Sequence, residues 1–239
     1  MAVFYLKPNL NKIKYPMKIT FFSDIRSKIY IIILSFFSAW SQAQNINLDS
    51  IKINVQNENS EFYYEKLIYK FKFDPTSLSD EEVKNLYYGK NFSKYRTYFF
   101  DPDYLDFMKS ISQKNWKKTI NYGEKYLVKD PTNTEVLTYI LLAYEKKDKE
   151  APNYGLYAAQ SKTLLNYIMQ NGDGKTKETA FKVNSVGEVY LIAGILGKNI
   201  RTFKRTSTMQ KDGTIDEFSK GDEKIYFKVF ENIENFTKP

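Results

Sequence analysis

The chain has 239 residues, of which 42% are hydrophobic and 27% are charged, so it can form the core of one globular domain or of a domain with an appendage. It contains no cysteine and no histidine, which excludes disulfides, thiolate nucleophiles, Ser-His-Asp triads and histidine-bearing zinc sites. Acid–base chemistry near neutral pH would therefore need a carboxyl group, a lysine or a tyrosine with a shifted pKa. The 20 tyrosines and 18 phenylalanines are interpreted as core rings whose tyrosine hydroxyls reach water or a polar partner.

The N-terminal segment has the pattern of a secretory signal peptide. An apolar run at residues 29–37 follows basic residues and precedes small residues at a candidate cleavage site. We expect cleavage after Ala43 or Gln44, which makes residues 1–44 the signal and residues 45–239 a single mature domain. Because 44 residues is long for such a signal, translation is predicted to start at Met17 or later.

The signal segment also accounts for most of the positive charge. Residues 1–44 contain six basic residues and one acidic residue, so the formal charge falls from +8 to +3 when they are removed. We therefore predict no nucleic-acid partner. We also predict no membrane span after signal removal, because the apolar run is shorter than the about 20 residues that a bilayer requires. No cysteine follows the cut, so no lipid anchor is expected there.

Residues 60–171 have the spacing of apolar residues that is typical of helices. Helices are predicted over residues 60–71, 79–89, 103–112, 115–129, 133–147 and 154–170, after a lead-in at 45–59 that is either a short helix or extended. Ser79 is a predicted N-cap, and Glu82 completes a capping box that accounts for the neighbouring acidic residues without a metal. Asp101 is a second predicted N-cap, with Pro102 at the first helical position.

The middle of this region resembles a tetratricopeptide repeat. Trp116 opens one helix, a DPTN turn occupies residues 130–133, and the sequence LLAY lies inside the next helix. Such a repeat is a helix pair of about 34 residues, and about three repeats are usually needed for independent stability. Because only one unit is well formed, we expect these helices to pack on the segments on either side.

Residues 172–239 have a mixed pattern. A strand is predicted at 180–183, a buried helix at 185–196, and three strands at 200–207, 214–218 and 224–230. The DG and GD pairs at residues 212–213 and 221–222 provide turns, so the three strands should form an antiparallel meander with one face on the core. The predicted fold class is therefore α+β, with helical hairpins followed by a small meander that packs on them.

The segment Gly174-Lys175-Thr176 resembles the end of a phosphate-binding loop. Met169 occupies the position where that loop requires glycine, and no strand precedes it. A calcium-binding loop also requires a glycine and a glutamate at fixed positions, and other residues stand there in this segment. We interpret the segment as a helix C-cap and a turn, and we predict no cofactor and no metal.

The order of several segments resembles a known bacterial family. The segments are FYY at residues 62–64, LYYG at 86–89 followed by Phe92 and Tyr95, the central helix pair, and the GDG turn at 172–174 followed by ETAFKV. Over nearly the whole mature region the chain resembles the family of the domain of unknown function 4919, and LYYG is the most specific element. The resemblance implies an exported protein of Gram-negative cells, periplasmic or secreted, and it implies no particular activity.

The first functional hypothesis is a non-enzymatic envelope module that binds a protein, a peptide or another ligand. Helix pairs of this kind present concave surfaces to peptides. Tyr87, Tyr88 and Arg96 are the candidate binding residues, since Tyr and Arg are frequent in interaction hot spots. The alternative for these three residues is that both tyrosines belong to the core and that Arg96 forms a surface ion pair.

The second hypothesis is a carboxylate-dependent hydrolase that acts on envelope glycans. Such an enzyme needs two acids about 5–9 Å apart across a cleft. Asp101, Asp103 and Asp106 form the densest acidic stretch beside aromatic residues. Capping explains Asp101 and solvent exposure explains the other two, and the sequence places no second acid opposite them.

Overall fold

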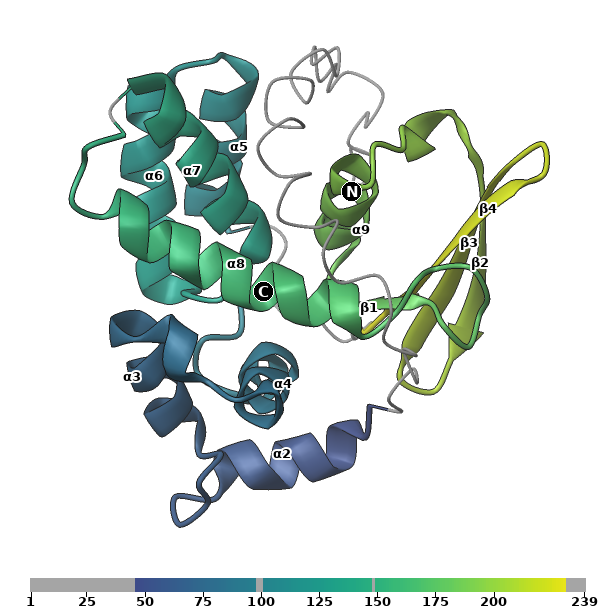
Figure 1. The fold of residues 1–239 in the computed structure, drawn as a ribbon, viewed down its shortest axis with the longest axis horizontal. Coiled ribbons are helices and arrows are strands. Elements are labelled where there is room, and N and C mark those ends of the chain that lie inside the picture. Colours follow the sequence, from purple (N-terminus) through teal and green to yellow (C-terminus); the bar gives the residue numbers. More distant parts are fainter. Residues whose placement is uncertain (1–45, 98–100, 148, 231–239) are drawn as a thin grey trace, which may run out of the picture. The chain divides into compact units, whose positions relative to one another are not determined.

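The computed structural model describes residues 46–97, 101–147 and 149–230. The predicted signal peptide at residues 1–44, its cleavage site and the proposed start at Met17 lie outside the described residues. The described part contains eight α-helices and a four-stranded sheet, so the predicted α+β class is confirmed (Figure 1). Within this part, no helix combines the length and the apolar character needed to cross a membrane.

The first group of helices includes the LYYG segment, which forms the end of α4. Its elements are α2 (Leu48–Gln56), α3 (Tyr64–Phe73), η3 (Pro75–Ser77), α4 (Asp80–Gly89) and η4 (Lys90–Phe92). The predicted capping box of α4 is confirmed: the Glu82 N–H donates to Ser79 Oγ, and the Ser79 N–H donates to the Glu82 carboxylate. Helix α4 packs against α2, α3 and α8, which explains why its second half is buried.

Four further helices pack consecutively in the middle of the chain. They are α5 (Pro102–Ser112), α6 (Trp116–Lys129), α7 (Thr134–Lys147) and α8 (Tyr154–Gln170). Each contacts the next, which confirms the predicted helical hairpins, whereas the tetratricopeptide assignment stays a prediction. Asp101 caps α5 as predicted, because its Oδ1 accepts the N–H groups of Asp103 and Tyr104. Helix α8 also contacts α3, α4 and β1, and so joins the helical groups to the sheet.

The sheet contains the predicted antiparallel meander, and a fourth strand that pairs in parallel makes it mixed. Its strands are β1 (Phe181–Val183), β2 (Lys204–Gln210), β3 (Gly213–Lys220) and β4 (Glu223–Val229), in the order β1-β4-β3-β2. Strands β2, β3 and β4 form the expected meander, but β1 adds to β4 in parallel, with Phe181 opposite Phe227. The parallel pairing is possible because α9 (Val186–Ile195) begins the long connection between β1 and the meander.

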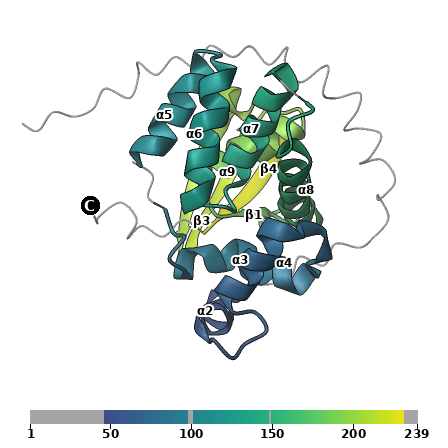
Figure 2. The ribbon, with the colours of Figure 1, turned by 90° about the vertical axis from the view of Figure 1, so that its left-hand side faces the viewer.

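The parallel pairing places β4 in the interior of the sheet. Residues 225–229 of β4 are buried on both faces, whereas every residue of the edge strand β2 is exposed. The sequence predicts that one face of the meander packs on the core. In the structure, the other face of β4 is covered as well. Helix α9 contacts β1, β4 and α7. Figure 1 shows α9 between the helices α5–α7 and the sheet, and Figure 2 shows the molecule from the side of those helices, with α9 and the sheet behind them.

The capping box of α4 provides a test of this architecture. Ser79→Ala removes the acceptor for the Glu82 N–H and should lower the free energy of unfolding by about 1 kcal/mol. Urea denaturation measures this loss. Ser207→Ala, on the exposed strand β2, is the matched control and should change stability by less than about 0.5 kcal/mol. Equal effects of the two substitutions would contradict the capping role.

Candidate functional site

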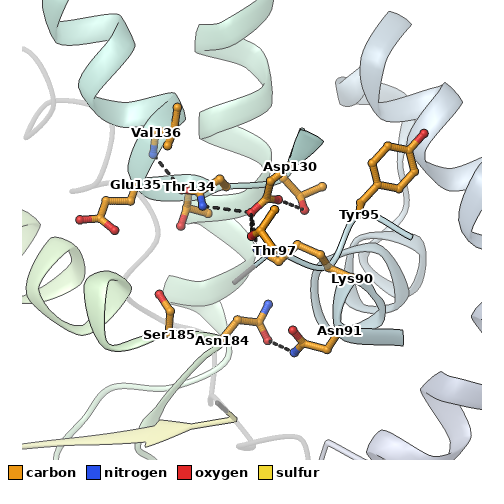
Figure 3. Close-up of polar contacts among 12 residues, drawn as sticks. Lys90, Asn91, Tyr95, Thr97, Asp130, Thr134, Glu135, Val136, Asn184 and Ser185 are labelled. Carbon is orange, nitrogen blue, oxygen red and sulfur yellow. Dashed lines mark hydrogen bonds and ion pairs between the residues drawn. The ribbon is translucent and has the colours of Figure 1, made fainter. Parts of the chain in front are cut away.

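Three segments that are distant in sequence meet beside the buried end of α4. They are the α4–η4 junction at Lys90 and Asn91, the turn at residues 130–133, and the turn between β1 and α9 at Asn184 (Figure 3). Pro131 fixes the second segment, because a residue before proline avoids the helical region and α6 ends at Lys129. We refer to these polar residues, together with Thr97, Thr134, Glu135 and Glu188, as the polar node.

Asp130 is the first centre of the polar node. Its side chain is fully buried, and its Oδ2 accepts hydrogen bonds from Lys90 Nζ at 2.9 Å, Thr97 Oγ1 at 3.1 Å and Asn133 Nδ2 at 3.0 Å. The Lys90 side chain is itself only 12% exposed. Asp130 and Coulombic attraction from Glu188 keep the pKa of Lys90 raised in spite of its burial. The pair is therefore a buried ion pair whose acid is also held by neutral donors.

Glu188, on the first turn of α9, is the second centre. Its Oε2 accepts the Tyr87 hydroxyl at 2.6 Å and the Asn184 N–H at 2.7 Å, and its Oε1 accepts the Thr134 hydroxyl. Ser185 caps α9 by accepting the Glu188 N–H at 3.2 Å. Burial and the neighbouring Glu188 carboxylate raise the pKa of Tyr87 well above its usual value, so this hydroxyl remains a donor.

Glu135 is the acid of the polar node that titrates near neutral pH. The hydroxyl of Tyr104, on α5, donates to its Oε2 at 2.6 Å. Gly187 of α9 lies so close that an added Cβ there would stand 2.2 Å from the same oxygen. Burial and the charge of Glu188 raise the pKa of Glu135 to about 7, although the bond from Tyr104 opposes the shift.

The structure places the predicted binding residues beside or inside the core. Tyr87 is 1% exposed and Tyr88 is 0% exposed, and the Tyr88 hydroxyl donates to the carbonyl oxygen of Lys182 at 3.2 Å. The Tyr88 ring also packs edge-on against Phe230, with 5.4 Å between the centroids. A partner therefore cannot contact either ring in this conformation, which agrees with the core interpretation of both tyrosines. Arg96 is half-buried in the segment after η4.

The acids considered for a hydrolase are paired with lysines. Lys129 Nζ lies 3.0 Å from Asp101, and Asp103 forms ion pairs with Lys125 at 2.6 Å and Lys129 at 2.5 Å. These hydrogen bonds lower the pKa of Asp103. Asp106 is exposed, as expected, whereas the Asp103 side chain is only 14% exposed, so the expectation of solvent exposure was wrong there because the two lysines cover it. The stretch is thus a cap with surface ion pairs, and it does not supply the raised-pKa acid that glycoside hydrolysis needs.

Sequence reasoning missed the centres of the polar node. Asp130 was read as part of a turn, and Glu188 fits the spacing of a capping box with Ser185. In the structure, Glu188 instead accepts the N–H of Asn184 and reaches Tyr87, which is 101 positions away. Only the helix-start pattern at Ser185 hinted at a role for this acid, because partners so distant leave no local signal.

The polar node uses its carboxylates to hold chain segments together. Four separate stretches of the chain donate hydrogen bonds to the carboxylates of Asp130 and Glu188. The donors include Tyr87, Lys90, Thr97 and Thr134. Across the described ranges, no cluster of three or more acidic side chains is arranged to hold a metal ion. The fold and this site together define an α+β protein whose helical layer and mixed sheet are joined by buried, hydrogen-bonded acids.

Comparison with known proteins identifies the family. The family model of the domain of unknown function DUF4919 matches residues 49–238, which is well over half of the chain. The chain therefore belongs to the DUF4919 family, as the order of its segments indicated. A search of curated proteins found no match, and a search of solved structures found none either.

The buried ion pair gives a second prediction. Asp130→Asn leaves the Lys90 ammonium without its counter-charge and should lower the free energy of unfolding by about 3–5 kcal/mol. Thermal and urea denaturation measure this loss, and Asp106→Asn is the exposed control. Lys90→Met in the Asp130→Asn background should restore part of the stability. If Asp130→Asn were as mild as the control, the network would not be holding the segments together.

Glu135 gives a third prediction, on pH. Its pKa is about 7 in the folded state, against 4.5 for a glutamate carboxyl exposed to water. Between these values the folded state holds a proton that the unfolded state has lost, so the free energy of unfolding falls as pH rises from about 4.5 to about 7. Glu135→Gln removes this titration while keeping an acceptor for Tyr104. The variant should therefore be more stable than the wild type at pH 8 and similar to it at pH 4, as measured by urea denaturation.

The control for this experiment is Glu61→Gln, at an exposed site. It should follow the wild-type pH profile. A Glu135→Gln profile that parallels the wild type from pH 4 to pH 8 would show that Glu135 does not titrate in this range.

Proposed function

We propose that this protein is a non-enzymatic binding module that is exported to the cell envelope. The signal pattern of residues 1–44 supports export, with a periplasmic or secreted mature protein and no lipid anchor. The buried acids of the polar node form hydrogen bonds within the chain, and this supports a role in stability instead of catalysis. The observation that carries the proposal is a pair of exposed aromatic rings on α3.

The two rings belong to Tyr69 and Phe73, which are 67% and 71% exposed. They lie one helical turn apart, and their centroids are 4.7 Å from each other. The rings lie on a shallow, wide-open part of the surface, whose lining also includes Tyr63, the acids Glu58, Glu65 and Asp74, and the lysines Lys66 and Lys70. We refer to this feature as the α3 hollow.

A rigid support holds the α3 hollow. Leu67, Ile68 and Phe71, on the other side of α3, are buried, and the helix packs on α4 and α8. Gln160 of α8 fixes the end of α3 by donating to the carbonyl oxygen of Phe71 at 3.1 Å. The aromatic rings are therefore presented on a fixed surface, and a partner that covers them gains about 25 cal/mol for each Å² of apolar area removed from water.

The hydrolase alternative has weaker support. Glu135 is the node acid with a pKa near neutrality, and the acid beside it is Glu188. Glu188 is 4% exposed and already accepts three hydrogen bonds within the chain, so it is not available as a nucleophile or as a base for water. The arrangement therefore favours binding over glycan hydrolysis.

Replacement of the two rings tests the proposal. Tyr69→Ala combined with Phe73→Ala should reduce capture of the envelope partner at least about tenfold, because exposed anchors of this type contribute much of the binding energy. The measurement is chemical crosslinking and affinity capture from envelope extract, followed by quantification of the captured species. Stability should change by less than about 0.5 kcal/mol for each exposed ring, which circular dichroism with urea verifies.

The matched control is Ile53→Ala combined with Val128→Ala. These side chains are 68% and 72% exposed on α2 and α6, and neither lines the α3 hollow. The control should capture as the wild type does. Undiminished capture by the Tyr69/Phe73 variant would contradict the proposed function.

A further inference from the structure

We propose that the α3 hollow binds a cationic side chain, arginine or lysine, that is carried by an extended segment of a partner protein. This inference rests on the proposed function and names the chemistry of its partner. It is carried by the charges that the hollow leaves unmatched and by the rings beside them.

The basic residues around the hollow are already engaged. Lys70 forms an ion pair with Glu82 at 2.8 Å, and Lys66 Nζ donates to the carbonyl oxygens of Glu58 and Ser60. Lys94 is paired with Glu65 at 3.1 Å. Of the two lysines in the lining, Lys70 is therefore matched by a carboxylate, whereas Lys66 is held by backbone carbonyls and keeps its positive charge.

Two carboxylates of the lining remain unmatched. Among the described residues, neither Glu58 nor Asp74 has a lysine or arginine within ion-pair distance, and both residues are exposed. Asp74 accepts one hydrogen bond, from the Thr76 hydroxyl at 2.9 Å, on Oδ1. Its second oxygen and the Glu58 carboxylate can therefore accept bonds from a partner. These two carboxylates outnumber the one lining lysine that has no ion pair, Lys66, so the charge left over in the hollow is negative.

The exposed rings favour the same ligand chemistry. The face of an aromatic ring attracts a cation, and the planar guanidinium of arginine stacks on such faces while it pairs with carboxylates. The chain uses this contact next to the hollow, where the ammonium groups of Lys72 and Lys94 lie 5.3 Å and 5.2 Å from the Tyr95 ring centroid. The rings of Tyr69 and Phe73 are accessible for an equivalent contact with a cation from outside.

Other occupants fit the charges less well. An anionic lipid surface would be repelled by Glu58 and Asp74. A purely apolar segment would cover these carboxylates without pairing them, which carries a desolvation penalty. In a second copy of the chain, Lys70 and Lys94 are paired with Glu82 and Glu65, and Lys66 is bonded to backbone carbonyls of its own chain. None of these three lysines is therefore directed at the acids of a neighbouring copy.

A matched pair of peptides tests the inference. Fluorescence anisotropy compares the purified protein with fluorescein-labelled Gly-Ser-Arg-Leu-Arg-Ser-Gly and with the same peptide carrying citrulline, a neutral isostere, at both arginine positions. The arginine peptide should bind about tenfold more tightly. Glu58→Gln combined with Asp74→Asn should abolish this difference, whereas the exposed control Glu61→Gln should preserve it. Added salt should weaken binding of the arginine peptide alone.

The outcomes separate this inference from the proposed function. Equal affinity for both peptides, with envelope capture that still depends on Phe73, would overturn the cationic specificity and leave the binding module intact. Capture that is independent of both Tyr69 and Phe73 would overturn both. Phe73-dependent self-association in sedimentation, or Phe73-dependent binding to phosphatidylglycerol vesicles without a peptide preference, would also overturn the inference.

Discussion

The buried carboxylate of Asp130 is the constraint on which the arrangement of this protein depends. A buried charge is costly unless its partners are in place, and those of Asp130 come from the end of α4, from the segment after η4 and from its own turn. Glu188 repeats this design 58 positions later and adds the β1–α9 turn. The helices and the sheet can therefore satisfy both acids only when all of these segments are in register.

The carboxylates of the polar node are bonded within the chain, and in this respect the node differs from the exposed surface of α3. The polar node contains the features that often mark a catalytic centre, namely buried acids, a buried lysine and a carboxyl group with a raised pKa. Here the donors of the chain itself occupy the oxygens of Asp130 and Glu188, so the perturbed groups stabilise the fold. The α3 hollow has the opposite character, because its rings are open and two of its acids lack a cation. This contrast is the reason for proposing that a partner binds at α3 and not at the node.

Local signals allowed much of the fold to be predicted. Ser79 with Glu82, and Asp101 with Pro102, marked the starts of α4 and α5, since capping depends on residues at most three positions apart. The parallel β1–β4 pair was missed, because a three-residue strand carries little pattern and its partner lies 46 positions away. The tyrosines of LYYG looked like anchors because composition cannot distinguish a buried ring from an exposed one. The α3 hollow was missed for a different reason. Helical spacing puts Phe71 and Phe73 on opposite faces, but single exposed aromatic residues are ordinary, and only the structure shows Phe73 stacked beside Tyr69 on an open surface.

The most direct test of this division is hydrogen–deuterium exchange of the protein, free and in complex with its captured envelope partner. If the α3 hollow is the binding surface, added protection in the complex should concentrate in residues 58–77. Residues 130–135 and 184–188 should exchange slowly in both states, because the node is buried and hydrogen-bonded without a partner. New protection at the node, with residues 58–77 unchanged, would contradict this view and would place function at the buried acids.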